Sequence, residues 1–193
     1  MRLTNQITGI ILAGGTSRRM GMDKALLKWE GQSFIKRIFK SLKTLTEEVI
    51  IVSDNPSHQI EDTTLVADVY KDGGPLAGLY AGLMASRTEC NLLLGCDTPF
   101  VRPDLLNKLI DAIEPGFDII MYRRADEDLP LLALYHKSCE KKCAELLRMN
   151  EFRLLALKDH CSVKSIDVEE EAVVQISNVN TMNDYYQLDG HHN

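Results

Sequence analysis

Along most of the chain, short apolar runs that predict strands alternate with stretches of helical periodicity. Continuous apolar runs, rich in β-branched residues, are typical of buried strands. They predict strands at Thr8–Ala13, Glu48–Ser53, Leu65–Ala67, Asn91–Gly95, Asp118–Tyr122, Pro130–Tyr135 and Val163–Val168. Apolar positions three or four residues apart predict helices at Ser33–Leu45, Pro75–Ala85, Pro103–Ile113, Lys137–Arg148 and Asn183–Leu188. The charged stretch Arg123–Asp128 predicts a hairpin connection between two of the strands.

The order of these elements, strand then helix and repeated, predicts an α/β fold. Strands that are apolar at every position are covered on both faces, as in parallel sheets with helices on each side. The length of 193 residues fits one domain. Because no repeat, low-complexity tract or linker divides the chain, we expect one sheet between two helical layers.

Composition and charge narrow the function classes. The chain is 45% hydrophobic and 26% charged, which is ordinary for a globular protein. Its net charge of −6 argues against a general binder of nucleic acid or anionic membranes. The five cysteines include no Cys-x-x-Cys pair, so we expect core or half-buried thiols. The start of the chain lacks a signal-peptide pattern and no apolar run is long enough to cross a bilayer, which predicts a cytoplasmic protein.

A segment dense in glycine and cations follows the first predicted strand. Gly14 and Gly15 can expose backbone N–H groups to an anion, and Arg18, Arg19 and Lys24 lie within seven residues of each other. Arginine offers phosphate a bidentate fork and lysine a point charge. The spacing matches neither Gly-x-x-x-x-Gly-Lys-Ser/Thr nor Gly-x-Gly-x-x-Gly. We predict a polyphosphate site of another kind; the alternative is a glycine-rich turn with solvated charges.

Two aspartates follow later strands, Asp68 after the third and Asp97 after the fourth. Ligands bind outside the carboxyl ends of parallel strands, so we expect both near the glycine segment. Mg²⁺ takes one or two protein carboxylates together with phosphate oxygens, which makes Asp97 a candidate ligand. The alternatives are a turn-forming Asp97 and a loop cap at Asp68. The small residues of Gly73–Gly78 let the backbone approach a flat base or, alternatively, form a structural turn.

These stretches together resemble the molybdenum cofactor guanylyltransferase family, part of a wider nucleotidyltransferase group. The resemblance covers nearly the whole chain and rests on LAGGTSRRMGMDK (12–24), GPLAG (74–78), CDTPF (96–100) and NVNT (178–181). It implies a Rossmann-like three-layer sandwich with a mostly parallel sheet, of the nucleotide-diphospho-sugar transferase type. It also implies a single nucleotidyltransferase domain over 1–193, in which residues 1–100 mainly bind the nucleotide and 101–193 mainly bind the acceptor.

The resemblance implies transfer of GMP from GTP to molybdenum-bearing molybdopterin, with release of pyrophosphate and a requirement for Mg²⁺. The implied nucleotide-binding residues are Leu12, Ala13, Gly14, Gly15, Lys24, Asp68, Gly78 and Asp97, and the implied acceptor-binding residues are Asn178 and Asn180. Arg19, Lys24 and Asp97 are the implied catalytic residues, with Asp97 as the metal ligand. The strand end Val52-Ser53-Asp54 has no match to an Asn that some members place near the nucleotide.

The partners implied are small molecules, GTP and molybdopterin, with transient contacts to other cofactor-biosynthesis proteins or to recipient molybdoenzymes. Neither nucleic acid nor a membrane is expected. The alternatives are a molybdopterin cytidylyltransferase, a sugar-phosphate or 2-phospholactate nucleotidyltransferase, and a non-catalytic nucleotide-binding protein. The segment 74–78 favours the guanylyl enzyme, and the presence of both Lys24 and Asp97 favours an enzyme over a binding protein.

Overall fold

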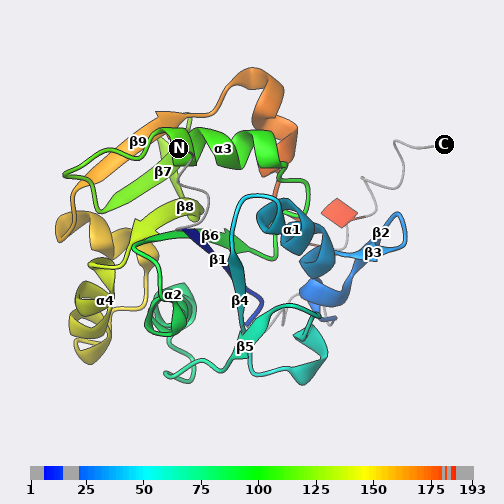
Figure 1. Ribbon diagram of the computed structural model, residues 1–193, viewed down its shortest axis with the longest axis horizontal. Coiled ribbons are helices and arrows are strands. Elements are labelled where there is room, and N and C mark those ends of the chain that lie inside the picture. The colour runs from blue at the N-terminus through cyan, green and yellow to red at the C-terminus, as the bar shows by residue number, and fades with distance from the viewer. Residues whose placement is uncertain (1–6, 15–21, 180, 182–183, 186–193) are drawn as a thin grey trace.

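The computed structural model describes residues 7–14, 22–179, 181 and 184–185, which form a seven-stranded sheet between helical layers (Figure 1). The strands of this sheet are β1 (Ile7–Leu12), β4 (Glu48–Val52), β5 (Thr64–Val66), β6 (Cys90–Gly95), β7 (Ile119–Arg124), β8 (Glu127–His136) and β9 (Val163–Asp167). Their order is β5-β4-β1-β6-β8-β7-β9. β8 pairs antiparallel with β6 and β7, and the other pairs are parallel. The predicted mostly parallel α/β sheet is confirmed.

Helices cover both faces of the sheet. They are α1 (Phe34–Lys43), α2 (Gly74–Ala85), α3 (Pro103–Asp111) and α4 (Cys139–Arg148). In Figure 1, α1 and α3 lie on one side of the sheet and α2 and α4 on the other. Each agrees with a predicted helix to within a few residues. Of the predicted helix Asn183–Leu188, the described residues are only Asp184 and Tyr185, so the rest of that prediction lies outside them.

The central strands are apolar throughout because their successive side chains enter two different cores. Ile11 of β1 packs in the layer of α1 and α3, whereas its neighbour Ile10 packs in the layer of α2 and α4. Leu92 and Leu93 of β6 divide in the same way. A strand buried on both faces loses the polar alternation of a half-exposed strand, which explains the apolar runs in the sequence.

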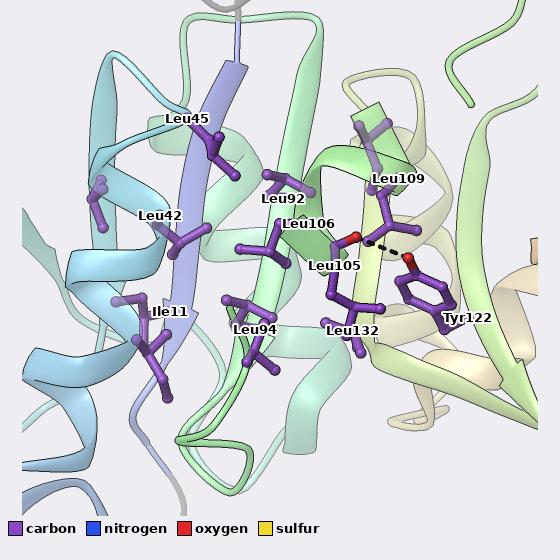
Figure 2. Close-up of a cluster of buried hydrophobic side chains, with 14 of the residues drawn as sticks. Ile11, Leu42, Leu45, Leu92, Leu94, Leu105, Leu106, Leu109, Tyr122 and Leu132 are labelled. Carbon is purple, nitrogen blue, oxygen red and sulfur yellow. Dashed lines mark hydrogen bonds between the residues drawn. The ribbon is translucent and has the colours of Figure 1, made fainter. Parts of the chain in front are cut away.

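The core on the α1 and α3 side includes one buried polar tie. Figure 2 shows leucines of α3 packed against β6 and β8, with the Tyr122 ring of β7 beside them. Tyr122 is 1% exposed, and its hydroxyl donates to the carbonyl oxygen of Leu105 over 2.8 Å. The bond satisfies a phenol that would otherwise be buried without a partner.

The predicted charged connection is a tight hairpin between β7 and β8. The ladder continues to the pair Arg124↔Glu127, so only Ala125 and Asp126 form the turn. Both have positive φ, 46° and 66°, as a two-residue hairpin turn requires. β8 therefore begins at Glu127, three residues before the predicted start at Pro130.

Several short elements were not predicted because they are too short to show a period. They are the antiparallel hairpin of β2 (Lys28–Trp29) and β3 (Gln32–Ser33), and the 3-10 turns η2 (Lys24–Leu26), η3 (Pro56–His58), η4 (Leu154–Asp159) and η5 (Glu170–Ile176). The hairpin supports a small separate core in which Trp29 and Phe34 pack with Val179. Within the described part of the chain, no helix is long and apolar enough to cross a membrane.

Candidate active site

A cavity of about 830 Å³ opens at the carboxyl ends of β1, β4, β5 and β6. Leu12, the last residue of β1, pairs with Gly95 at the end of β6 and with Val52 at the end of β4. The strand order reverses at β1, because β4 and β5 extend the sheet to one side and β6 to the other. Sheets of this type bind their ligands in the crevice at such a reversal.

The cavity brings together most of the site residues expected from the sequence. Its lining includes Leu12, Ala13, Gly14, Lys24, Asp68, Gly78 and Asp97. Gly15, Arg18, Arg19 and Asn180 lie outside the described residues. Asn178 is exposed and does not line the cavity, although the amide of the next residue, Val179, donates to the Asp97 carbonyl oxygen over 2.9 Å. The chain after η5 therefore returns to the edge of the site.

Asp97 carries a buried carboxylate oxygen into this cavity. Its Oδ1 finds no hydrogen-bond donor among the residues that the structure describes. Burial raises the pKa of Asp97, and the positive charge of Lys24 opposes that rise. An unpaired buried carboxylate is costly unless a cation satisfies it. Asp97 does lie in a turn, as the alternative interpretation had it, and that turn also brings its carboxylate to the cavity.

The Asp97 carboxylate is a suitable ligand for a divalent cation. Such a cation would have to take further ligands from a bound substrate. No cluster of three or more His, Cys, Asp or Glu side chains suited to a metal occurs in the described part of the chain. A hard cation such as Mg²⁺ commonly uses one or two carboxylates and completes its shell with phosphate oxygens and water. The site thus suits a metal that arrives with a phosphorylated ligand.

Asp68 lines the cavity from the loop after β5 and also caps that loop. Its Oδ1 accepts a hydrogen bond from the Tyr70 amide over 3.0 Å, the capping geometry that was the alternative for this residue. Burial raises the pKa of Asp68, the Tyr70 hydrogen bond lowers it, and the nearby Asp54 raises it again. Asp68 is therefore a loop cap that also presents a carboxylate to the cavity.

The glycines at the start of α2 allow close packing within the protein and also line the cavity. Gly74 has φ +63°, and a Cβ there would lie 3.1 Å from the Phe152 carbonyl oxygen. A Cβ at Gly78 would lie 3.0 Å from Cδ2 of Leu12. The missing side chain at Gly78 thus lets α2 approach β1, and because Gly78 also lines the cavity, the close approach of a ligand base there stays a prediction.

The cavity wall also includes polar residues that the sequence did not point to, and Asp23, Ser53, Asn55 and His58 form one group of them. The Asn55 amide Nδ2 donates to Asp23 Oδ2 over 2.9 Å, and His58 Nε2 lies 2.8 Å from the same oxygen. Asn55 stands two residues beyond Ser53, where no asparagine was matched. The rule that ligands meet strand ends could have pointed to Ser53 and Asn55, because both follow β4.

Comparisons with known proteins place the chain among nucleotidyltransferases. A family model described as the MobA-like NTP transferase domain matches residues 9–161. A Bacillus cytotoxicus protein named "Probable molybdenum cofactor guanylyltransferase" is 31% identical, over 94% of this chain and 96% of its own length. A protein of the same name from Pelotomaculum thermopropionicum is 34% identical, over 93% and 90%.

Solved structures agree on the fold. Molybdopterin-guanine dinucleotide biosynthesis protein A from Archaeoglobus fulgidus superimposes with a TM-score of 0.81 at 22% identity, over 95% of this chain and 97% of that one. A nucleotidyl transferase from Methanothermobacter thermautotroptrophicus superimposes with a TM-score of 0.76 at 19% identity, over 97% of each chain. At these identities the likeness concerns the fold alone.

Proposed function

Because the chain belongs to the MobA-like NTP transferase domain family, we propose that it is a molybdenum cofactor guanylyltransferase. It transfers GMP from GTP to molybdenum-bearing molybdopterin, forms the guanine dinucleotide of that cofactor and releases pyrophosphate. The observation that carries the proposal is the opposition of Lys24 and the buried Asp97 carboxylate in one cavity at the reversal of the strand order. The named relatives supply the choice of guanine and of molybdopterin.

The reaction is a displacement at the α-phosphorus of GTP. An oxygen of the molybdopterin phosphate forms the new bond to this phosphorus, while the bond to the bridging oxygen of the β-phosphate breaks and its electron pair leaves with pyrophosphate. The attacking phosphate is already ionised near neutral pH, so no general base is needed. The enzyme therefore contributes mainly alignment and charge neutralisation.

Lys24 is suited to the β- and γ-phosphates, because its positive charge acts on Asp97 in the same cavity, which Lys71 also lines. Ala13 and Gly14 both border the cavity. The Ala13 amide donates to the Val52 carbonyl oxygen over 3.1 Å, so we assign the phosphate contact to the Gly14 N–H. Asp97 would hold Mg²⁺, which when bound supplies positive charge to the phosphate oxygens. The protein's own part is then to hold Lys24 and Asp97 in the same cavity.

The remaining roles are proposed from the family resemblance. Leu12 and Gly78 would border the nucleoside, and Asp68 would contact it through the oxygen not used in capping. Gly15 and Arg19 would bind the phosphates. Asn178 and Asn180 would face the pterin, in keeping with the Val179 amide that joins this segment to Asp97.

Pyrophosphate release tests the proposal. The purified protein is incubated with Mg²⁺, metal-loaded molybdopterin and GTP, CTP, UTP or ATP in separate reactions, and the dinucleotide product is identified by mass. We expect stoichiometric pyrophosphate and product with GTP, and neither when Mg²⁺ or the acceptor is left out.

Each alternative has its own outcome in this assay. Turnover with CTP in place of GTP would identify a cytidylyltransferase of the same cofactor. Pyrophosphate release only with a sugar phosphate or 2-phospholactate as acceptor would replace molybdopterin as the substrate. GTP binding with no pyrophosphate under any condition would leave a nucleotide-binding protein without transfer activity.

A further inference from the structure

A continuous hydrogen-bonded chain of three side chains lies in the wall of the nucleotide cavity and has no part in the mechanism above. Ser53 Oγ is 2.7 Å from His58 Nδ1, and His58 Nε2 is 2.8 Å from Asp23 Oδ2. His58 is only 2% exposed, and all three residues line the cavity. These hydrogen bonds connect the loop after β4 to the segment that carries Lys24.

Donors and acceptors along this chain fit one arrangement with a neutral imidazole. The Asp23 carboxylate can only accept, so His58 Nε2 carries the proton and donates to it. His58 Nδ1 then accepts from the Ser53 hydroxyl, and the Ser53 oxygen in turn accepts from the backbone N–H of Asn55 over 3.1 Å. Each of these buried groups therefore has a partner, as buried polar groups require.

Asp23 connects these hydrogen bonds to the turn that begins with the neighbouring Lys24. Its Oδ1 accepts from the Ala25 amide over 3.1 Å and so caps η2, the turn that begins with Lys24. Its Oδ2 accepts from His58 and from Asn55, both of which follow β4. One carboxylate thus fixes the turn that bears Lys24 and joins that turn to the end of β4.

We propose that His58 is a positioning residue for nucleotidyl transfer, which holds the Asp23 carboxylate against the end of β4 and so keeps the Lys24 turn in place opposite Asp97. The inference rests on the proposed function, which assigns Lys24 to the phosphates of the nucleotide. A displacement of about 1 Å in a group that neutralises charge can lower a rate by about two orders of magnitude, so such a support matters for turnover.

The same three residue types form the triad of many hydrolases, but here they do not supply a nucleophile. Ser53 is 4% exposed, and its oxygen already binds the Asn55 amide as well as His58. A nucleophilic serine needs its oxygen open to the substrate. The hydrogen-bonded side chains of Ser53, His58 and Asp23 therefore support the cavity wall, and Ser53 does not attack the nucleotide.

Two amide substitutions separate the two ends of the imidazole. The side-chain nitrogen of His58→Gln reaches the position of Nε2 and can still donate to Asp23, whereas the shorter side chain of His58→Asn reaches the position of Nδ1 near Ser53 and leaves Asp23 without this donor. The control is His136→Asn, at the end of β8, where the imidazole is exposed and pairs with Glu89 and Ser138.

Steady-state rates with GTP and metal-loaded molybdopterin are then measured for all four proteins. We expect His58→Asn to lower kcat/KM for GTP about tenfold or more, with a raised KM for GTP and an unchanged KM for the acceptor. His58→Gln should stay within about threefold of the wild type, and the control should equal it. A variant that only unfolds in part would lower kcat without raising either KM.

Amide hydrogen exchange of the segment 22–27 in the ligand-free proteins supplies a readout that needs no activity. Faster exchange of Ala25 and Leu26 in His58→Asn, but not in His58→Gln, supports the structural part of the inference, that His58 holds the Lys24 turn in place. This part stands even if the wild type releases no pyrophosphate from GTP, in which case the proposed function fails and with it the link to nucleotidyl transfer. Equal exchange in the two variants overturns the inference. If the wild type is active, the inference is also overturned when His58→Asn and His58→Gln lose activity equally or when neither loses activity.

Discussion

Lys24 and Asp97, which are distant in the sequence, act on each other across the candidate active site, where the lysine charge opposes the rise that burial causes in the pKa of the aspartate. Lys24 follows the glycine segment after β1, and Asp97 follows the neighbouring strand β6. With a divalent cation on Asp97, this pair would supply the local positive charge that the proposed phosphate site needs in a chain of net charge −6. Two of our predictions test the two members of this pair directly.

Asp97→Asn should abolish most turnover and yet stabilise the metal-free protein. Because burial raises the pKa of Asp97 in the folded state, the ionised carboxylate costs stability at neutral pH. The gain in Tm should be full above the folded-state pKa and should disappear as the pH falls towards the ordinary value of 3.8. Thermal unfolding across this range measures it, with the exposed Asp62→Asn as control. A Tm at neutral pH below that of the wild type would contradict the prediction.

Lys24→Ala should lower kcat/KM for GTP by at least about tenfold, because the developing charge of pyrophosphate loses the lysine that acts on Asp97, although Lys71 still lines the cavity. The matched control is Lys36→Ala, an exposed position of α1 where alanine suits the helix. Pyrophosphate release at varied GTP measures both. A Lys24 variant within a factor of two of the control would remove Lys24 from the phosphate role.

Gly78 and Gly82 lie on the same face of α2, but we expect different effects of alanine at the two positions. Gly82→Ala should mainly lower stability, and Gly78→Ala should mainly weaken GTP binding. A new Cβ at Gly82 would lie 2.7 Å from Cγ2 of Ile10, a side chain fully enclosed in the core. We expect a loss of about 1–3 kcal/mol in the free energy of unfolding, partly offset by the better helix propensity of alanine. Denaturant unfolding measures this loss.

At Gly78 the nearest atom is instead the end of the Leu12 side chain, which borders the cavity and can move. Gly78→Ala should therefore change stability by less than Gly82→Ala but weaken GTP binding, as measured by titration of the protein with GTP. If Gly78→Ala proves the more destabilising and binds GTP normally, the packing argument is wrong.

Tyr122→Phe should cost about 1–2 kcal/mol of stability and leave turnover unchanged. The substitution removes the hydroxyl that donates to the Leu105 carbonyl oxygen in the core (Figure 2). Tyr122 does not line the cavity. Urea unfolding and the pyrophosphate assay check the two halves; a loss of turnover in folded protein would show that this core bond reaches the site.

Cys161 should be the first cysteine to react with iodoacetamide. A hydrogen bond from the Cys139 thiol, 3.9 Å away, lowers the pKa of Cys161 and so raises its thiolate fraction at a given pH. Burial raises the pKa of Cys90, Cys96 and Cys143. Peptide mass mapping after brief labelling at neutral pH, with a denatured sample as reference for intrinsic reactivity, tests this order. Earlier labelling of the half-buried Cys90 would refute it.

The sequence by itself determined the elements of the sheet and its layers, because strands that are buried on both faces appear in the sequence as continuous apolar runs. It also pointed to Gly14, Lys24, Asp68 and Asp97, since residues after parallel strands must gather at one edge. The roles of these residues remain predictions.

Tertiary structure alone decided how the site is supported. The bond of His58 to Asp23 joins two loops, and loop side chains have no periodicity that foretells their partners. The contact of Gly78 with Leu12 could not be predicted, because it depends on how closely α2 approaches β1. The antiparallel pairing of β8 with β6 likewise depends on which strands become neighbours, whereas its pairing with β7 follows from the predicted hairpin. Periodicity reports whether a residue is buried, whereas its partner is fixed only when the elements pack.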